Sequence, residues 1–277
     1  MSEGIGTRRL TWAVAVAVLA ALLQILGPLF PLVRPDHPAG FAAGPLFVVL
    51  ALLPPVGALF ATWRRRPAAG LGLLMAVALF APGRLVSDLQ LATDVSYSAR
   101  PELVLPTSLA PLHPGVGLWL LVAGHACAML AGGVAAWSLR AARGDDAGTA
   151  AGGAPRRQGR VTFALSAGLV AAVALLVVAP LASDDPFLLS RTLLEQQAPT
   201  LVGGLLLMIA AVVASVSGAA YPDRWRAVGG TAGAALGLLT VAVPDVVSGL
   251  AVPRLHPTWG PCVVLAVAAA LAVLASF

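Results

Sequence analysis

The chain has 277 residues, of which 59% are hydrophobic and only 10% are charged. Ordinary soluble chains carry about a quarter charged residues, so this composition leaves too little polar surface to cover a soluble fold and indicates an integral membrane protein. A net charge of +5 often accompanies nucleic-acid binding. Here the positive charge follows the pattern of a membrane-topology signal, and we expect no nucleic-acid partner.

The basic residues and the cysteines give information on origin and compartment. All 17 basic residues are Arg, and both Lys and Asn are absent, which is typical of a GC-rich genome. We therefore expect a plasma (inner) membrane protein of a bacterium with such a genome. Cys127 and Cys262 both lie inside apolar segments, so they predict neither a disulfide framework nor a metal site.

Eight windows along the chain are apolar over the roughly 20 residues that a membrane-spanning helix needs. The sequence thus predicts an all-α, polytopic transmembrane bundle. The third and seventh windows are the least regular, because each runs into a proline and a charged residue at one end. The windows are 12–33, 43–63, 67–87, 115–138, 161–182, 198–220, 227–247 and 258–276.

Arginine positions predict the orientation of this bundle. With a cytoplasmic N-terminus, the inside segments hold 12 of the 17 Arg residues and the outside segments hold 5. Acidic residues show the opposite bias, with 4 inside and 8 outside. Because each inside segment is Arg-rich, the positive-inside rule predicts that both termini are cytoplasmic.

The chain divides into two parts of similar design. We expect a first four-helix half at 1–139, a flexible Gly/Ala-rich cytoplasmic linker at 140–160, and a second four-helix half at 161–277. Four short motifs recur in the same order in both halves, which suggests a parallel 4+4 repeat; chance similarity between apolar segments is the alternative. The matched motifs are Trp63-Arg64 with Trp225-Arg226, Leu71-Gly72-Leu73-Leu74 with Leu236-Gly237-Leu238-Leu239, Pro82 with Pro244, and Leu112-His113-Pro114 with Leu255-His256-Pro257.

Small residues repeat every four positions on two of the spans. Gly229, Gly233 and Gly237 do so on the seventh span, and Gly124, Ala128 and Gly132 do so on the fourth. This spacing predicts faces along which helices pack backbone against backbone.

The outer ends of the third and seventh spans carry the charged residues Arg84, Asp88 and Asp245. Arg84 and Asp88 are four residues apart and share a helix face, and Pro244 frees a backbone carbonyl close to Asp245. We therefore treat these three residues as the candidate polar site for a ligand or ion. The alternative is that Arg84 and Asp88 neutralise one another while Asp245 faces water.

His125 lies about ten residues into the fourth span and is the remaining candidate within the membrane. An ionisable group at this depth is costly and marks a functional site by default. The alternative is a neutral imidazole bonded to a carbonyl of a neighbouring helix. Gln24 in the first span is expected to form a hydrogen bond between helices.

The outer loops offer weaker candidates: Asp36, His37, His113 and His256. His and Asp are ordinary metal ligands, but no pair has a ligand spacing on one element, so we expect no metal. His113 and His256 each precede a proline at the start of a span, where capping the helix end explains them.

Known catalytic motifs are missing from the sequence, which contains no HExxH, P-loop, GxSxG or Rossmann pattern. We expect no catalytic residues and no cofactor. The first functional hypothesis is a non-enzymatic membrane component, such as a subunit, assembly factor or sensor, that acts through membrane protein partners. The alternatives are a small-solute or ion transporter built from two four-helix repeats, and a membrane enzyme acting on lipid or quinone at the outer face.

Overall fold

The computed structural model describes residues 3–34, 44–93, 113–143, 154–183, 192–196, 198–251 and 255–276. In this part of the chain, eight helical spans are long and apolar enough to cross a membrane, as the sequence predicts. Asp36 and His37 lie outside the described residues, so their role as weaker site candidates stays a prediction.

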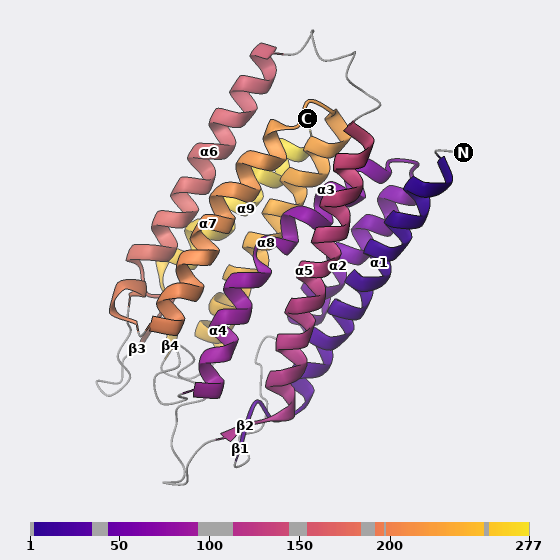
Figure 1. The fold of residues 1–277 in the computed structure, drawn as a ribbon. Coiled ribbons are helices and arrows are strands. Elements are labelled where there is room, and N and C mark those ends of the chain that lie inside the picture. Colours follow the sequence, from indigo (N-terminus) through magenta and orange to yellow (C-terminus); the bar gives the residue numbers. More distant parts are fainter. Residues whose placement is uncertain are drawn as a thin grey trace.

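Helices fill almost all of the described chain (Figure 1). The first half contains α1 (Glu3–Leu26), α2 (Gly44–Trp63), α3 (Pro67–Ala78), α4 (Ala81–Thr93) and α5 (Val116–Arg143). The second half contains α6 (Ala154–Val177), α7 (Ala198–Ala220), α8 (Arg224–Ala251) and α9 (Trp259–Ser276). Two 3-10 turns, η1 (Gly27–Leu29) and η4 (Leu193–Glu195), follow α1 and precede α7.

The third span is not the single continuous helix that the 67–87 window predicts. It consists of α3 and α4, separated at Leu79 and Phe80. There the backbone tightens, because the Leu79 and Phe80 amides donate to carbonyls three residues back, at 3.3 and 3.1 Å. Pro82 explains the break, since it has no N–H for the carbonyl four residues earlier and its ring collides with that carbonyl.

The seventh span, in contrast, continues through its proline. Helix α8 runs from Arg224 to Ala251 with Pro244 inside it, and so extends beyond the predicted 227–247 at both ends. Asp223 caps its start by accepting a hydrogen bond from the Arg226 amide at 2.8 Å. Pro244 has no N–H to donate to the Thr240 carbonyl, so α8 lacks one of its helical hydrogen bonds at this point.

A short antiparallel strand pair lies in each half, at the end of the bundle opposite the chain termini (Figure 1). In the first half, β1 (Val33–Arg34) follows α1 and pairs with β2 (His113–Pro114), which precedes α5. In the second half, β3 (Leu181–Ser183) follows α6 and pairs with β4 (Leu255–Pro257), which precedes α9. Each pair thus connects the first and fourth spans of its own half.

Helices α5 and α6 extend into the segment that separates the two halves. Helix α5 continues to Arg143 and α6 begins at Ala154, and residues 144–153 of the predicted linker lie outside the described part of the chain. Arg140 is exposed in the last turn of α5, where a positive side chain interacts favourably with the helix dipole. Both chain ends and these two helix ends lie at one end of the bundle, and the strand pairs lie at the other (Figure 1).

The two halves pack against each other along α3 and α8, and along α4 and α7. The α3–α8 contact depends on glycine. A Cβ on Gly72 would lie 2.9 Å from the Arg226 carbonyl oxygen, and one on Gly233 would lie 2.6 Å from that of Leu73. A Cβ on Gly229 would likewise collide with the backbone of Ala69. The expected small-residue packing face is therefore confirmed on the seventh span.

Candidate functional site

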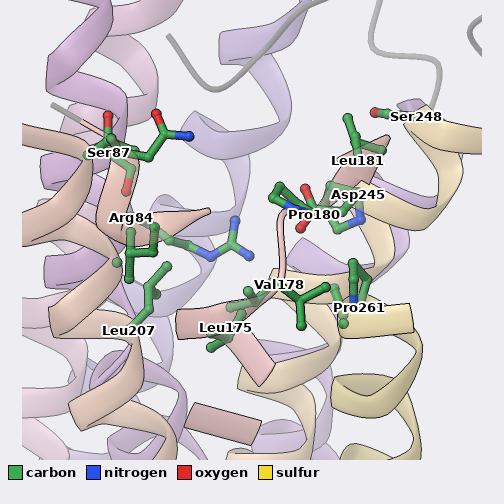
Figure 2. A pocket seen from close by; sticks show the side chains of 18 of the residues that line it. Arg84, Ser87, Leu175, Val178, Pro180, Leu181, Leu207, Asp245, Ser248 and Pro261 are labelled. Carbon is green, nitrogen blue, oxygen red and sulfur yellow. The ribbon is translucent and has the colours of Figure 1, made fainter. Parts of the chain in front are cut away.

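A cavity of about 240 Å³ lies between α4 of the first half and the outer parts of the second half (Figure 2). Its polar lining comes from α4, the segment before α7, and α8. Its apolar lining comes mainly from the end of α6, from α7 and from α8. The lining residues used below are Arg84, Ser87, Asp88, Gln90, Leu175, Val178, Thr200, Leu207, Val241, Asp245 and Ser248.

The cavity brings together all three charged residues that the sequence singles out at the outer span ends. Arg84 projects from α4, and Asp245 lies on the opposite side, on α8 (Figure 2). Both side chains are half-buried, and both also interact with other groups of the protein. A positive and a negative group thus face the same small space within the apolar spans.

Asp88 is the most deeply buried of the three, with 5% of its surface exposed. Its Oδ2 atom lies 3.1 Å from Nε2 of His125, which is also 5% exposed. His125 in turn lies 3.2 Å, through Nδ1, from Nε2 of Gln24 on α1. Three spans therefore supply one buried polar chain, Gln24–His125–Asp88, which ends at the cavity.

Two hydrogen bonds orient the His125 ring. The Gln24 amide nitrogen donates to Nδ1 when that atom is the unprotonated nitrogen of a neutral imidazole. In that tautomer Nε2 carries the proton and donates it to the Asp88 carboxylate. His125 is therefore bonded to two side chains, and not to a helix carbonyl as in the alternative reading of the sequence. The expected interhelical hydrogen bond of Gln24 is present.

Gly124 explains how α1 and α5 come close enough for this contact. A Cβ at this position would lie 2.8 Å from Cγ of Gln24 and 3.2 Å from the Ala20 carbonyl oxygen. The residue next to His125 therefore has no side chain at the point where α1 crosses. Gly124 and the Gln24–His125 hydrogen bond are thus parts of the same contact between α1 and α5.

Gln90 and Thr200 form a second buried polar contact at the cavity wall, connecting α4 to α7 through the Thr200 hydroxyl and the Gln90 amide oxygen. Next to it, Thr192 and Glu195 form a capping box that shapes η4, with the Thr192 amide donating to Oε2 of Glu195 at 2.9 Å. Sequence reasoning did not identify Gln90 or Thr200. Gln90 could have been identified from the sequence, because it is a polar side chain two residues after Asp88 in an otherwise apolar span.

Of the weaker candidates, His113 and His256 do not line the cavity. His113 is exposed in β2 opposite Arg34, and His256 is exposed in β4 opposite Ala182. Among the residues that the structure describes, no group of three or more His, Cys, Asp or Glu side chains is placed to hold a metal ion.

No protein-family model, curated protein or solved structure matches this chain. The fold and the eight apolar spans define its class directly: it is a multi-pass, all-α membrane protein.

Proposed function

We propose that this chain is a carrier for a small, charged organic solute, built from two four-helix repeats in a bacterial plasma membrane, with both termini in the cytoplasm. The observation that carries the proposal is the cavity between α4 and the second half, in which Arg84 and Asp245 face one another from different halves. Charged groups inside membrane spans are costly, and they are retained where they line a solute or ion path.

Corresponding features of the two halves support the repeat. Each half closes its outer end with a strand pair that joins its first and fourth spans, and His113 and His256 occupy the second strand of their pairs. One alanine-rich core cluster lies within the first half, the other combines the second half with Ala76 and Phe80 of the first, and the third spans of the two halves pack against one another. Carriers commonly place their binding site between such repeats.

The packing on either side of the cavity supports a carrier rather than a channel. All of the lining residues belong to the outer parts of their elements. Toward the inner end, Gly72, Gly229 and Gly233 bring α3 and α8 into backbone contact. A cavity near one end of the bundle and tight helix packing toward the other end are what one state of an alternating-access cycle requires.

The walls of the cavity suggest the chemistry of the solute. Arg84 offers a guanidinium to a carboxylate, and Asp245 offers a carboxylate to an ammonium group. Leu175, Val178 and Leu207 present apolar surface. A zwitterion with a small apolar body satisfies all three features, in competition with the partners that Arg84 and Asp245 already have.

The other functional classes make different demands. A partner-dependent component requires a protein that co-purifies in fixed ratio, and an enzyme requires turnover of a lipid or quinone at the outer face. The cavity favours the carrier because neither alternative needs opposite charges facing one another inside the bundle.

Transport assays with defined probes test the proposal. Purified protein in phosphatidylcholine vesicles is offered L-leucine, choline or butyrate, which represent a zwitterion, a cation and an anion. We expect accumulation of L-leucine in preference to the other two, and loss of at least about ten-fold in apparent affinity, or about 1.4 kcal/mol, in R84A and in D245A.

R140A is the matched control, because it removes an exposed Arg at the inner end of α5, far from the cavity. Folded yield is measured for every variant. Wild-type vesicles that take up none of the probes, or R84A and D245A vesicles that match R140A, would refute the carrier with this solute class.

A further inference from the structure

We propose that the Asp88–His125 pair is a proton-binding site of the cavity, and that its proton is the coupling ion of the carrier. The inference rests on the proposed function for its coupling role, but the proton site itself stands on separate geometry. Asp88 lines the cavity, and His125 Nε2 lies 3.1 Å from its carboxylate.

The pair has room for an additional proton without rearranging its heavy atoms. With His125 neutral and Asp88 ionised, the pair carries one negative charge. The cavity gives access to the Asp88 carboxylate, and one added proton, shared between this carboxylate and the imidazole, gives a pair with no net charge. No bond between heavy atoms forms or breaks.

Gln24 is the residue that makes both states acceptable. In the neutral state its Nε2 donates to Nδ1 of His125 at 3.2 Å. When Nδ1 is protonated, the amide turns over, and the amide oxygen accepts the new N–H instead. A carbonyl or an ammonium group at this position would serve only one of the two states. Gln24 is therefore a positioning residue for the proton site.

Among the described residues, the elements packed against the pair carry few other ionisable groups, and those of α1, which are Glu3, Arg8 and Arg9, lie at the opposite end of that helix from Gln24. Arg84 lies one helical turn before Asp88 on α4, and Asp245 faces the cavity from α8. Helix α7, which also packs on α4, has no ionisable side chain between Ala198 and Ala220. β2 contacts α4 and contributes His113, whose side chain is exposed. α3 contributes no ionisable group within Pro67–Ala78.

Coupling to the solute follows from this geometry. A solute carboxylate at Arg84 and the ionised Asp88 are like charges at neighbouring positions, so each disfavours the other in a site of low dielectric constant. Proton binding removes the net charge of the pair and thereby favours solute binding. By linkage, the solute favours the proton to the same degree. Cooperative binding of the two is what a proton-coupled symporter requires.

A spectroscopic titration tests the proton site without any solute. The chain has four His residues, so replacing His37, His113 and His256 by Gln leaves His125 as the single source of ¹⁵N-histidine signals. At alkaline pH we expect the neutral tautomer with its proton on Nε2, and on acidification a transition to two protonated ring nitrogens. This transition should shift in D88N and remain near its original position in D245N, the matched carboxylate control from the same cavity.

Two further variants keep the test independent of a single substitution. Q24L removes the amide and should also shift the transition, because the imidazolium loses its acceptor, whereas Q24E restores an acceptor. A His125 transition that is identical in D88N, D245N and the parent protein would overturn the proposal, as would a His125 that stays in one form over the whole range in which the protein remains folded.

The coupling role is tested in the vesicles described above. An inward proton gradient should increase L-leucine accumulation by the wild type and by R140A, and should not increase it in D88N of matched folded yield. Gradient-independent accumulation by the wild type would overturn the coupling. If no probe is transported while the His125 transition depends on Asp88, the carrier function fails and the proton site stands.

Discussion

The guanidinium carbon of Arg66 lies 3.5 Å from the centroid of the Trp225 ring. Arg66 ends the turn between α2 and α3, and Trp225 begins α8, so this stacked contact joins the two halves at their inner end. Arg224 approaches the same ring at 5.6 Å. Trp225 precedes Gly229 and Gly233, the glycines of α8 that pack against α3, so the contact lies at the end of the bundle away from the cavity.

We predict that R66A destabilises the protein by about 0.5 to 2 kcal/mol, since a cation over an indole contributes on this scale. R64A is the matched control, because Arg64 contacts Phe60 and Trp63 of its own helix end instead of the other half. Thermal unfolding in detergent measures both variants. Equal effects of R66A and R64A would show that the contact between the halves contributes nothing specific.

Arg65 occupies a strained position in the same turn. Its φ angle is 57°, in the left-handed region that disfavours residues with a Cβ. We predict that R65G raises the free energy of unfolding by roughly 0.5 to 1 kcal/mol, because glycine adopts this conformation without steric cost. R65A retains the Cβ and serves as the control for the lost charge. A gain in R65A equal to that in R65G would assign the effect to charge instead of backbone strain.

The α3–α8 contact predicts a large difference between two glycines. G229A places a methyl group against the Ala69 backbone and should destabilise the protein by about 1 to 3 kcal/mol. Gly133 has open space around it, so G133A should be neutral or stabilising by up to about 1 kcal/mol. Unfolding midpoints of the two variants give the comparison. A tolerated G229A would mean that the two helices separate easily at this point.

Much of this architecture could be predicted from composition and charge. Apolar length alone gives the eight spans, because a helix is the way to satisfy the backbone in lipid. The break at Leu79 and Phe80 could not be placed, since Pro82 and Pro244 look alike in sequence but only the first interrupts its helix. The difference depends on the tertiary surroundings, in which Phe80 is packed against Gly237.

The candidate site was predictable in its members but not in its connections. Arg84, Asp88 and Asp245 stand out because charge is rare within apolar spans, and the cavity brings them together. The contact between Asp88 and His125 could not be inferred, because the four-residue spacing points only to Arg84 on the same helix. Sequence spacing describes neighbours on one helix and gives no information on which helices meet.

The final prediction concerns orientation in the membrane, on which the outward-facing cavity depends. In a protein with Cys127 and Cys262 replaced by Ala, single cysteines are introduced at Ala141, exposed near the end of α5, and at Leu194, exposed in η4 at the opposite end. Arg-rich segments gather at the end that holds Ala141, so the positive-inside rule places it in the cytoplasm. An impermeant maleimide added to intact cells should label L194C and spare A141C, and lysis should expose A141C. The reverse pattern would turn the whole bundle over and place the cavity on the cytoplasmic side.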